Sequence, residues 1–130
     1  MSKELERVQI AETKAFDLYI LENKVLFFDY RKNITMGLED VKDAYDLYLK
    51  HSEGYSYKVL ITFGRFTTIE ADARKYAEQK RMPTPAQAIV IRNLAQRLLV
   101  RFYSNFRKDS HPLKFFENEE DAVEWLNGLS

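Results

Sequence analysis

Short apolar runs alternate with longer amphipathic stretches along most of the chain. An apolar run of four to eight residues between turn signals is typical of a strand, whereas apolar positions that recur every three or four residues indicate a helix. The pattern predicts strands over residues 13–21, 25–30, 58–63, 88–91 and 113–116. It predicts helices over residues 38–50, from 67 to about 80, from 94 to about 108, and after Asn118. The predicted element order is therefore β-β-α-β-α-β-α-β-α.

The first two predicted strands flank a short turn, Glu22-Asn23-Lys24, and so form an antiparallel hairpin. Asn23 is the turn residue that best tolerates a left-handed backbone. The later strands are apolar on both faces and alternate with helices, which indicates a largely parallel sheet covered by helices. We therefore expect a single α/β domain over residues 1–130. Its sheet is predicted to be mixed, mostly parallel and five-stranded, with an N-terminal antiparallel hairpin and about four helices.

Polar residues precede two of the predicted helices in patterns that favour capping. Thr67 and Glu70 have the spacing of a capping box, in which the threonine accepts a hydrogen bond from the first turn and the glutamate reaches back. Asn118 is followed by three acidic residues, and the dipole of a helix favours negative charge in its first turn. Both patterns predict helix starts at these positions.

The composition excludes several classes of protein. Hydrophobic residues make up 45% of the 130 residues and charged residues 31%, an ordinary balance for a soluble domain. The 20 basic and 20 acidic residues cancel, which argues against nucleic-acid binding. No cysteine is present, so disulfides and thiolate chemistry are excluded. No apolar run reaches the length of a membrane span and the first residues do not read as a signal peptide, so a cytoplasmic location is expected.

Three segments carry a resemblance to a known family. Val59-Leu60-Ile61-Thr62-Phe63 leads into the predicted threonine-capped helix, and residues 88–97 and 115–126 are the other two segments. With the element order, these segments resemble SpoIIAA/STAS-like domains, in particular an uncharacterised bacterial branch related to CRAL-TRIO-like folds. The resemblance covers the chain from about Phe16 onward. It implies a small domain used in protein–protein regulation, as in anti-sigma-factor antagonists, whereas CRAL-TRIO-like folds bind lipids.

The resemblance also implies a phosphorylatable serine or threonine at the start of the helix after the central strand. Thr67 and Thr68 occupy that place here. The Asp-Ser pattern of the regulators, followed by small residues and glycine, is missing, and capping already accounts for a hydroxyl at this position. The sequence therefore argues against a phosphoswitch at these two threonines.

Sequence signatures of common enzyme classes are absent. The four glycines stand too far apart for a phosphate-binding loop, and no Gly-x-Ser-x-Gly elbow or zinc-ligand spacing occurs. The only histidines, His51 and His111, are placed near a helix C-terminus and in a turn, where structural roles are expected. We expect a protein that is not an enzyme and that uses no cofactor or metal.

The predicted helix from residue 94 to 106 has an unusually wide apolar arc. Its apolar side chains span about 180° of the surface, whereas a surface helix commonly needs little over 100°. Three interpretations remain open: deep burial, a dimer or partner surface, and the wall of a ligand pocket. Under the second interpretation Tyr103 or Phe106 lies at a subunit contact.

Four arginines are candidates for an anionic ligand or partner. Arg97 and Arg101 form one ridge on the opposite side of that helix. Like charges four residues apart destabilise a helix unless a nearby negative charge compensates them. Arg65 and Arg92 follow predicted strands, near the edge where open α/β sheets bind ligands. Solvation, or pairing with the acidic C-terminal helix, is the alternative explanation for this charge.

Together these features predict a non-enzymatic STAS-like protein-interaction or regulatory module, with a second copy or another protein as its partner. The alternative is a small carrier that binds a lipid or another apolar anionic ligand. A partner surface predicts exposed aromatic rings and no interior void. A carrier predicts an enclosed apolar pocket of several hundred Å³ with an arginine at its mouth.

Overall fold

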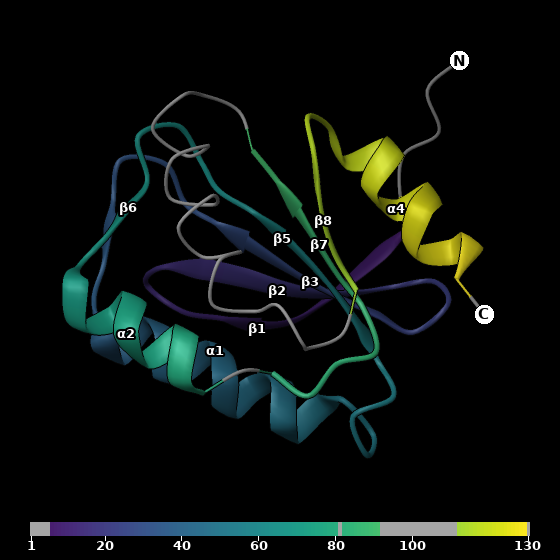
Figure 1. Cartoon of the computed structure of the whole chain (residues 1–130), viewed down its shortest axis with the longest axis horizontal. Helices are drawn as coiled ribbons and strands as arrows, with labels where there is room; N and C mark the ends of the chain where they lie inside the picture. The colour runs from purple at the N-terminus through teal and green to yellow at the C-terminus, as the bar shows by residue number, and fades with distance from the viewer. Residues whose placement is uncertain (1–5, 81, 92–111, 130) are drawn as a thin grey trace.

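The computed structural model describes residues 6–80, 82–91 and 112–129 (Figure 1). Its elements in chain order are β1 (Arg7–Glu12), β2 (Phe16–Leu21), β3 (Val25–Tyr30), β4 (Thr35–Met36), α1 (Leu38–His51), β5 (Lys58–Thr62), β6 (Thr68–Ile69), α2 (Ala71–Gln79), β7 (Gln87–Val90), β8 (Leu113–Phe116) and α4 (Glu119–Gly128). Within these described residues, no helix is both long enough and apolar enough to cross a membrane.

The main sheet has six strands in the order β1-β2-β3-β5-β7-β8. The first three strands pair antiparallel, and the pairs from β3 to β8 are parallel. The predicted mixed, mostly parallel sheet with an N-terminal antiparallel hairpin is therefore confirmed. The predicted count of five strands is wrong, because β1 adds a strand before the hairpin.

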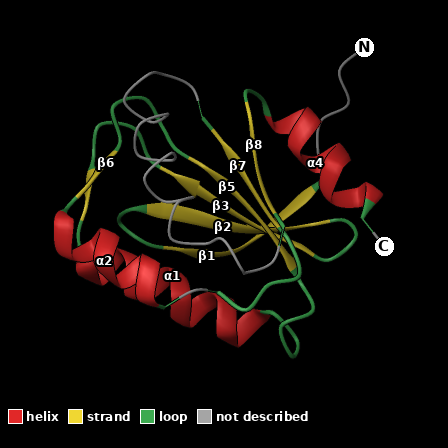
Figure 2. Cartoon of the chain, in the orientation of Figure 1, coloured by secondary structure: helices red, strands yellow, loops and turns green. Residues whose placement is uncertain are grey.

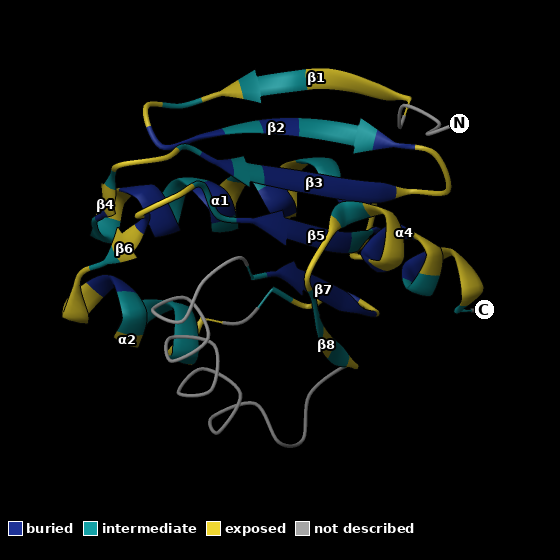
Figure 3. Ribbon diagram, turned by 90° about the horizontal axis from the view of Figure 1, so that it is seen from above, coloured by how far each residue is buried: buried dark blue, intermediate teal, exposed yellow. Residues whose placement is uncertain are grey.

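Helices cover both faces of this sheet. Figure 2 shows α1 and α2 side by side on one face and α4 on the other. Both crossovers from β3 to β5 and from β5 to β7 carry a helix to the same face, as right-handed connections that step in one direction require. Two cores result: Phe28 and Tyr48 belong to the core beneath α1, and Phe27 and Leu126 to the core beneath α4. Figure 3 shows the central strands as the most buried part of the sheet.

The hairpin turn has the conformation that its sequence predicts. Asn23 has a φ of 64° and Lys24 a φ of 58°, both left-handed. The strand before the turn begins later than predicted, at Phe16. Residues 13–15 form a turn instead, in which the Thr13 hydroxyl oxygen accepts hydrogen bonds from the backbone N–H groups of Ala15 and Phe16.

Strand β1 was not predicted because little of it is buried. Four of its six residues are exposed and the other two are half-buried, so it shows no clear apolar pattern. The pairing with β2 shifts between Gln9 and Ala11, which places a β-bulge at Ile10. Bulges and charged residues protect an edge strand from pairing with another chain.

The predicted capping box at Thr67 is wrong. The chain stays extended through β6, where Thr68 and Ile69 pair with Thr35 and Met36 of β4. Helix α2 therefore begins only at Ala71, and its N-cap residue is Glu70. The backbone hydrogen bonds of the small two-stranded sheet hold residues 68–69 in the strand conformation. The helix therefore cannot begin at Thr67, although the local sequence has the capping pattern.

The predicted cap of the last helix is confirmed. The Asn118 side chain accepts a hydrogen bond of 2.9 Å from the backbone N–H of Asp121. The opposite end of α4 is tied to the centre of the sheet, because the Lys58 ammonium donates to the carbonyl oxygens of Leu126 and Leu129 at 2.6 and 2.7 Å.

The predicted helix from residue 94 to about 108 lies outside the described residues. Five residues singled out from the sequence lie outside them too: Arg92, Arg97, Arg101, Tyr103 and Phe106.

Candidate functional site

The loop between β5 and β6, residues 63–67, follows the carboxyl end of a central parallel strand. Open α/β sheets bind ligands beyond this edge. The β5–β6 loop contains Arg65 and Thr67, and Thr68 follows it directly. The structure thus brings together three of the residues singled out from the sequence.

The β5–β6 loop is fastened to β3 and to the segment that follows β3. Such fixation lowers the conformational entropy that the loop loses when it binds a partner. Three hydrogen bonds provide it: Gly64 N–H to the Tyr30 carbonyl (3.0 Å), Asn33 N–H to the Arg65 carbonyl (2.8 Å), and the Thr67 hydroxyl to the Arg31 carbonyl (2.5 Å).

Gly64 permits a close approach of two backbone segments. A β-carbon at this position would lie 2.3 Å from the backbone nitrogen of Lys32. No side chain fits there unless one of the segments moves, so the glycine is a packing requirement.

Phe66 is the most unusual residue of the loop. Its side chain is large and apolar, yet the residue is 67% exposed. Its φ of 62° lies in the left-handed region, which bulky residues rarely adopt. The guanidinium carbon of Arg65 lies 6.0 Å from the centre of the Phe66 ring, within the range of a cation–π contact.

The two threonines differ in accessibility. Thr67 is buried, and its hydroxyl donates to the Arg31 carbonyl. Thr68 is exposed, and its hydroxyl lies 3.0 Å from that of Thr35. Neither threonine stands at the start of α2, so neither occupies the helix position that the family resemblance assigns to a phosphoacceptor.

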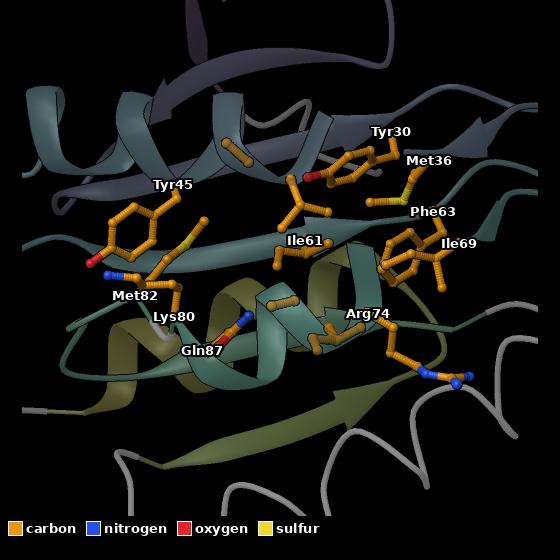
Figure 4. Close-up of a pocket in the computed structure, with 14 residues that line it drawn as sticks. Tyr30, Met36, Tyr45, Ile61, Phe63, Ile69, Arg74, Lys80, Met82 and Gln87 are labelled. Atoms are coloured by element: carbon orange, nitrogen blue, oxygen red, sulfur yellow. The ribbon is translucent and has the colours of Figure 1, made fainter. Parts of the chain in front are cut away.

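A cavity of about 90 Å³ adjoins the loop, between the sheet and the two helices α1 and α2 (Figure 4). Phe63 and Ile69, which flank the loop, both line it. Most of the remaining lining is apolar, including Tyr30, Met36, Val41, Ile61, Met82 and Ile89.

Three polar side chains border the cavity. Figure 4 shows Lys80 beside Tyr45 at one end, and Arg74 at the other end with its guanidinium directed away from the apolar lining. Gln87 reaches the lining from β7 and is 1% exposed. Pockets for drug-sized ligands measure roughly 300–1,000 Å³. The cavity therefore has room for a small apolar group and is smaller than a carrier of whole lipids requires.

None of the titratable groups with shifted pKa values lines the cavity. Partial burial, and then the nearby charge of Lys50, lower the pKa of His51. Partial burial raises the pKa of Asp43, and the carboxylates of Glu39, Asp40 and Asp46 raise it further. No group of three histidine, cysteine or acidic side chains in the described part of the chain is arranged to hold a metal ion.

Comparison with known proteins identifies the family. The family model described as a domain of unknown function, DUF7793, matches residues 19–130. The chain belongs to the DUF7793 family. No curated protein matches this DUF7793 chain.

A solved structure establishes the fold of this DUF7793 chain. It is that of an uncharacterized protein from the DUF3478 family with a SpoIIAA-like fold, from Shewanella loihica PV-4. The two chains are 18% identical over 97% of this chain and 98% of the other, with a TM-score of 0.58. The predicted SpoIIAA-like fold is confirmed.

Sequence reasoning found the position of the β5–β6 loop but missed its central residue. Phe66 lies between two residues that were singled out, and nothing in the sequence distinguishes its ring from a buried one. The cavity was also missed, because Phe63, Ile69 and Met82 come from separate elements.

Proposed function

We propose that this DUF7793 protein is a non-enzymatic interaction module of a regulatory kind, and that it binds a partner protein through the β5–β6 loop. The observation that carries the proposal is the exposed ring of Phe66 on a strained, left-handed backbone. Arg65 beside it supplies a positive charge.

Two unfavourable features coincide at Phe66. Burial of a side chain of this size stabilises a protein by about 1.5–3 kcal/mol, and this stabilisation is lost while the ring stays in water. A left-handed backbone at a non-glycine residue costs roughly 1–2 kcal/mol more. Asparagine or glycine at this position would avoid both costs. A partner that buries the ring recovers the first of them, and aromatic side chains dominate the binding energy of many interfaces.

The charges around the loop favour a partner other than a second copy. Arg65 and Lys32 are both exposed, and the backbones of Lys32 and Gly64 lie in close contact. A two-fold contact between two such loops would bring like charges together, which costs affinity. The best-fitting partner has an apolar pocket for the ring and carboxylates at its rim.

The substitution Phe66→Asn tests the proposal, with Tyr55→Asn as a matched control. Tyr55 is also an exposed aromatic residue, 49% exposed with a φ of 66°, but it precedes β5 at the opposite end of the strand. A photo-crosslinking amino acid at position 66 first identifies the partner in the cells that make the protein. Titration calorimetry with the purified partner then measures the dissociation constant of each variant.

We expect Phe66→Asn to weaken binding at least tenfold and Tyr55→Asn to change it less than twofold. Both variants should gain about 1 kcal/mol of stability, since asparagine tolerates the left-handed backbone. A loss of binding in Phe66→Asn thus cannot come from unfolding. Equal effects of the two substitutions, or crosslinks that avoid position 66, contradict the proposal.

A small carrier of an apolar anionic ligand is the second candidate, and the cavity beneath α2 is the observation that favours it. Its apolar lining suits a short alkyl chain or a single ring, and Arg74 and Lys80 offer positive charge at its two ends. Native mass spectrometry after gentle purification weighs any retained ligand. Ala77→Leu, which fills part of the lining, should remove that extra mass; a retained mass in this variant contradicts the carrier.

A further inference from the structure

A second surface lies at the far end of the sheet, where β8 runs beside α4 (Figure 1). An open groove of about 590 Å³ follows the two elements. It is lined by Lys114, Phe116, Asp121, Glu124, Trp125, Gly128 and Leu129, which we call the β8–α4 groove.

The walls of the β8–α4 groove are fixed in place. Ala122 and Leu126 of α4 are fully buried against the sheet. The Asn118 cap holds the first turn of the helix, and Lys58 holds the carbonyl groups at its end. A partner therefore meets a preformed groove, and binding need not order this helix.

The floor of the groove is aromatic. The rings of Phe116 and Trp125 lie 5.7 Å apart between centres, with an interplanar angle of 47°. Lys114 and Phe116 pair with Ala88 and Val90 of β7, whose side chains belong to the core beneath α4, so both point to this face. Trp125 is half-buried, which leaves part of its ring available to a partner.

The rim of the groove carries more negative than positive charge. Asp121 and Glu124 are both exposed, against one exposed basic residue of the lining, Lys114, whose ammonium lies 5.5 Å from the centre of the Phe116 ring. The helix dipole explains acidic residues in the first turn, but Glu124 lies beyond that turn. Within the described residues no ion pair of 4.0 Å or less involves Glu124.

One side of the groove is a sheet edge. In the part of the chain that the structure describes, β8 pairs with β7 on its inner side and has no strand on its outer side. Edge strands offer unpaired backbone groups, and extended peptides bind such edges by adding a strand.

We propose that the β8–α4 groove binds an extended basic segment of a partner protein, which adds a strand to β8. Every second side chain of this segment faces α4. Among these, apolar side chains rest on Phe116 and Trp125, and lysine or arginine side chains lie beside Asp121 and Glu124. This surface is separate from the β5–β6 loop, so the two proposals are tested independently.

Trp125 provides a direct readout, because it is the only tryptophan of the chain. The probe, the lysine–valine peptide, is an acetylated seven-residue peptide with threonine at the even positions and valine and lysine in turn at the odd positions, so that valine and lysine share one face of the strand. It is titrated while the tryptophan emission is recorded. The controls are a glutamate–valine peptide of the same length and a lysine–valine peptide with alternate backbone amides methylated. We expect both controls to bind at least tenfold more weakly, since the first reverses the charge and the second removes strand hydrogen bonds.

Two charge reversals on α4 locate the binding site. Glu124→Lys should weaken the lysine–valine peptide about fivefold or more and leave the helix content unchanged in circular dichroism. Glu120→Lys alters an exposed residue of the same helix outside the groove and should change binding less than twofold. Equal binding of the basic and acidic peptides, indifference to amide methylation, or equal effects of the two reversals overturns the proposal.

Discussion

Gly64 joins the β5–β6 loop to the segment after β3, and its substitution should be costly. In Gly64→Ala the new methyl group would lie 2.3 Å from the Lys32 backbone nitrogen, so one segment must move. We expect the free energy of unfolding to fall by about 2 kcal/mol or more. Urea denaturation of the purified variant measures it.

Gly128→Ala is the matched control, because a β-carbon there meets no atom within 4 Å. This glycine is the last residue of α4, so alanine should be neutral or stabilise the protein by up to about 1 kcal/mol. Equal stabilities of the two variants would show that the loop does not depend on the close backbone approach.

The pKa of Asp43 predicts a substitution that stabilises the protein. Partial burial, together with Glu39, Asp40 and Asp46, raises this pKa, so the folded state disfavours the ionised carboxylate. The carboxylate then reduces stability at pH 7, whereas below its ordinary pKa of 3.8 it is protonated in both states. Asp43→Asn should therefore raise the melting temperature at pH 7, by an amount that corresponds to about 0.3 kcal/mol, and the gain should vanish near pH 3.

Asp121→Asn serves as the comparison for this pH series. Asp121 lies in the first turn of α4 and accepts a hydrogen bond from the Asn118 side chain, so its negative charge is favourable there. Its removal should lower the melting temperature at pH 7. If Asp43→Asn lowers it as well, the repulsion among the acidic residues of α1 is not significant.

Strand β1 should be the least stable element of the main sheet. It lies at the edge, most of its residues are exposed, and the bulge at Ile10 interrupts its pairing with β2. Native-state hydrogen exchange should show its amides opening at a much lower free energy than those of β5, which has strands on both sides. Similar protection of the two strands would mean that β1 belongs to the cooperative core.

The same features of the elements explain how far the sequence predicts the fold. Buried strands such as β3 and β5 can be recognised in the sequence, because apolar residues on both faces form an uninterrupted apolar run. Strand β1 does not, since exposed residues carry no such pattern. The start of α2 was misplaced because the capping pattern at Thr67 is local, whereas the pairing of β6 with β4 joins residues 33 positions apart.

The candidate site was less predictable than the fold for a related reason. Arg65 was found because strand ends can be located from the sequence. The strain at Phe66 was not, because it arises from hydrogen bonds that join the loop to residues 31 and 33. The cavity and the β8–α4 groove depend on side chains from several elements, and only the packed structure brings these together.

At the scale of the whole molecule, Lys58 links the main sheet to the helix layer formed by α4. Its ammonium lies at the start of a central strand and donates to two carbonyl groups at the end of α4. Hydrogen bonds to charged groups contribute about 1.5–3 kcal/mol, less where water has access. We expect Lys58→Met, which keeps the unbranched apolar part of the side chain and removes the ammonium, to lower the free energy of unfolding by about 1–2 kcal/mol.

Lys50→Met is the control for Lys58, because Lys50 is an exposed lysine in the last turn of α1. It should cost only a few tenths of a kcal/mol, as expected for an exposed charge near a helix end. Chemical denaturation of both variants provides the comparison. Equal losses would show that the link between the sheet and α4 adds nothing beyond a general charge effect.

The strands of the main sheet follow one another in space as they do along the chain, and this order bears on how the protein is made. A ribosome releases β1 first and β8 last, so each new strand meets the edge formed by the strand released before it. No strand has to insert between two others that are already paired. The sheet can therefore grow during translation from one side only, and the last edge to form is the one that borders the β8–α4 groove.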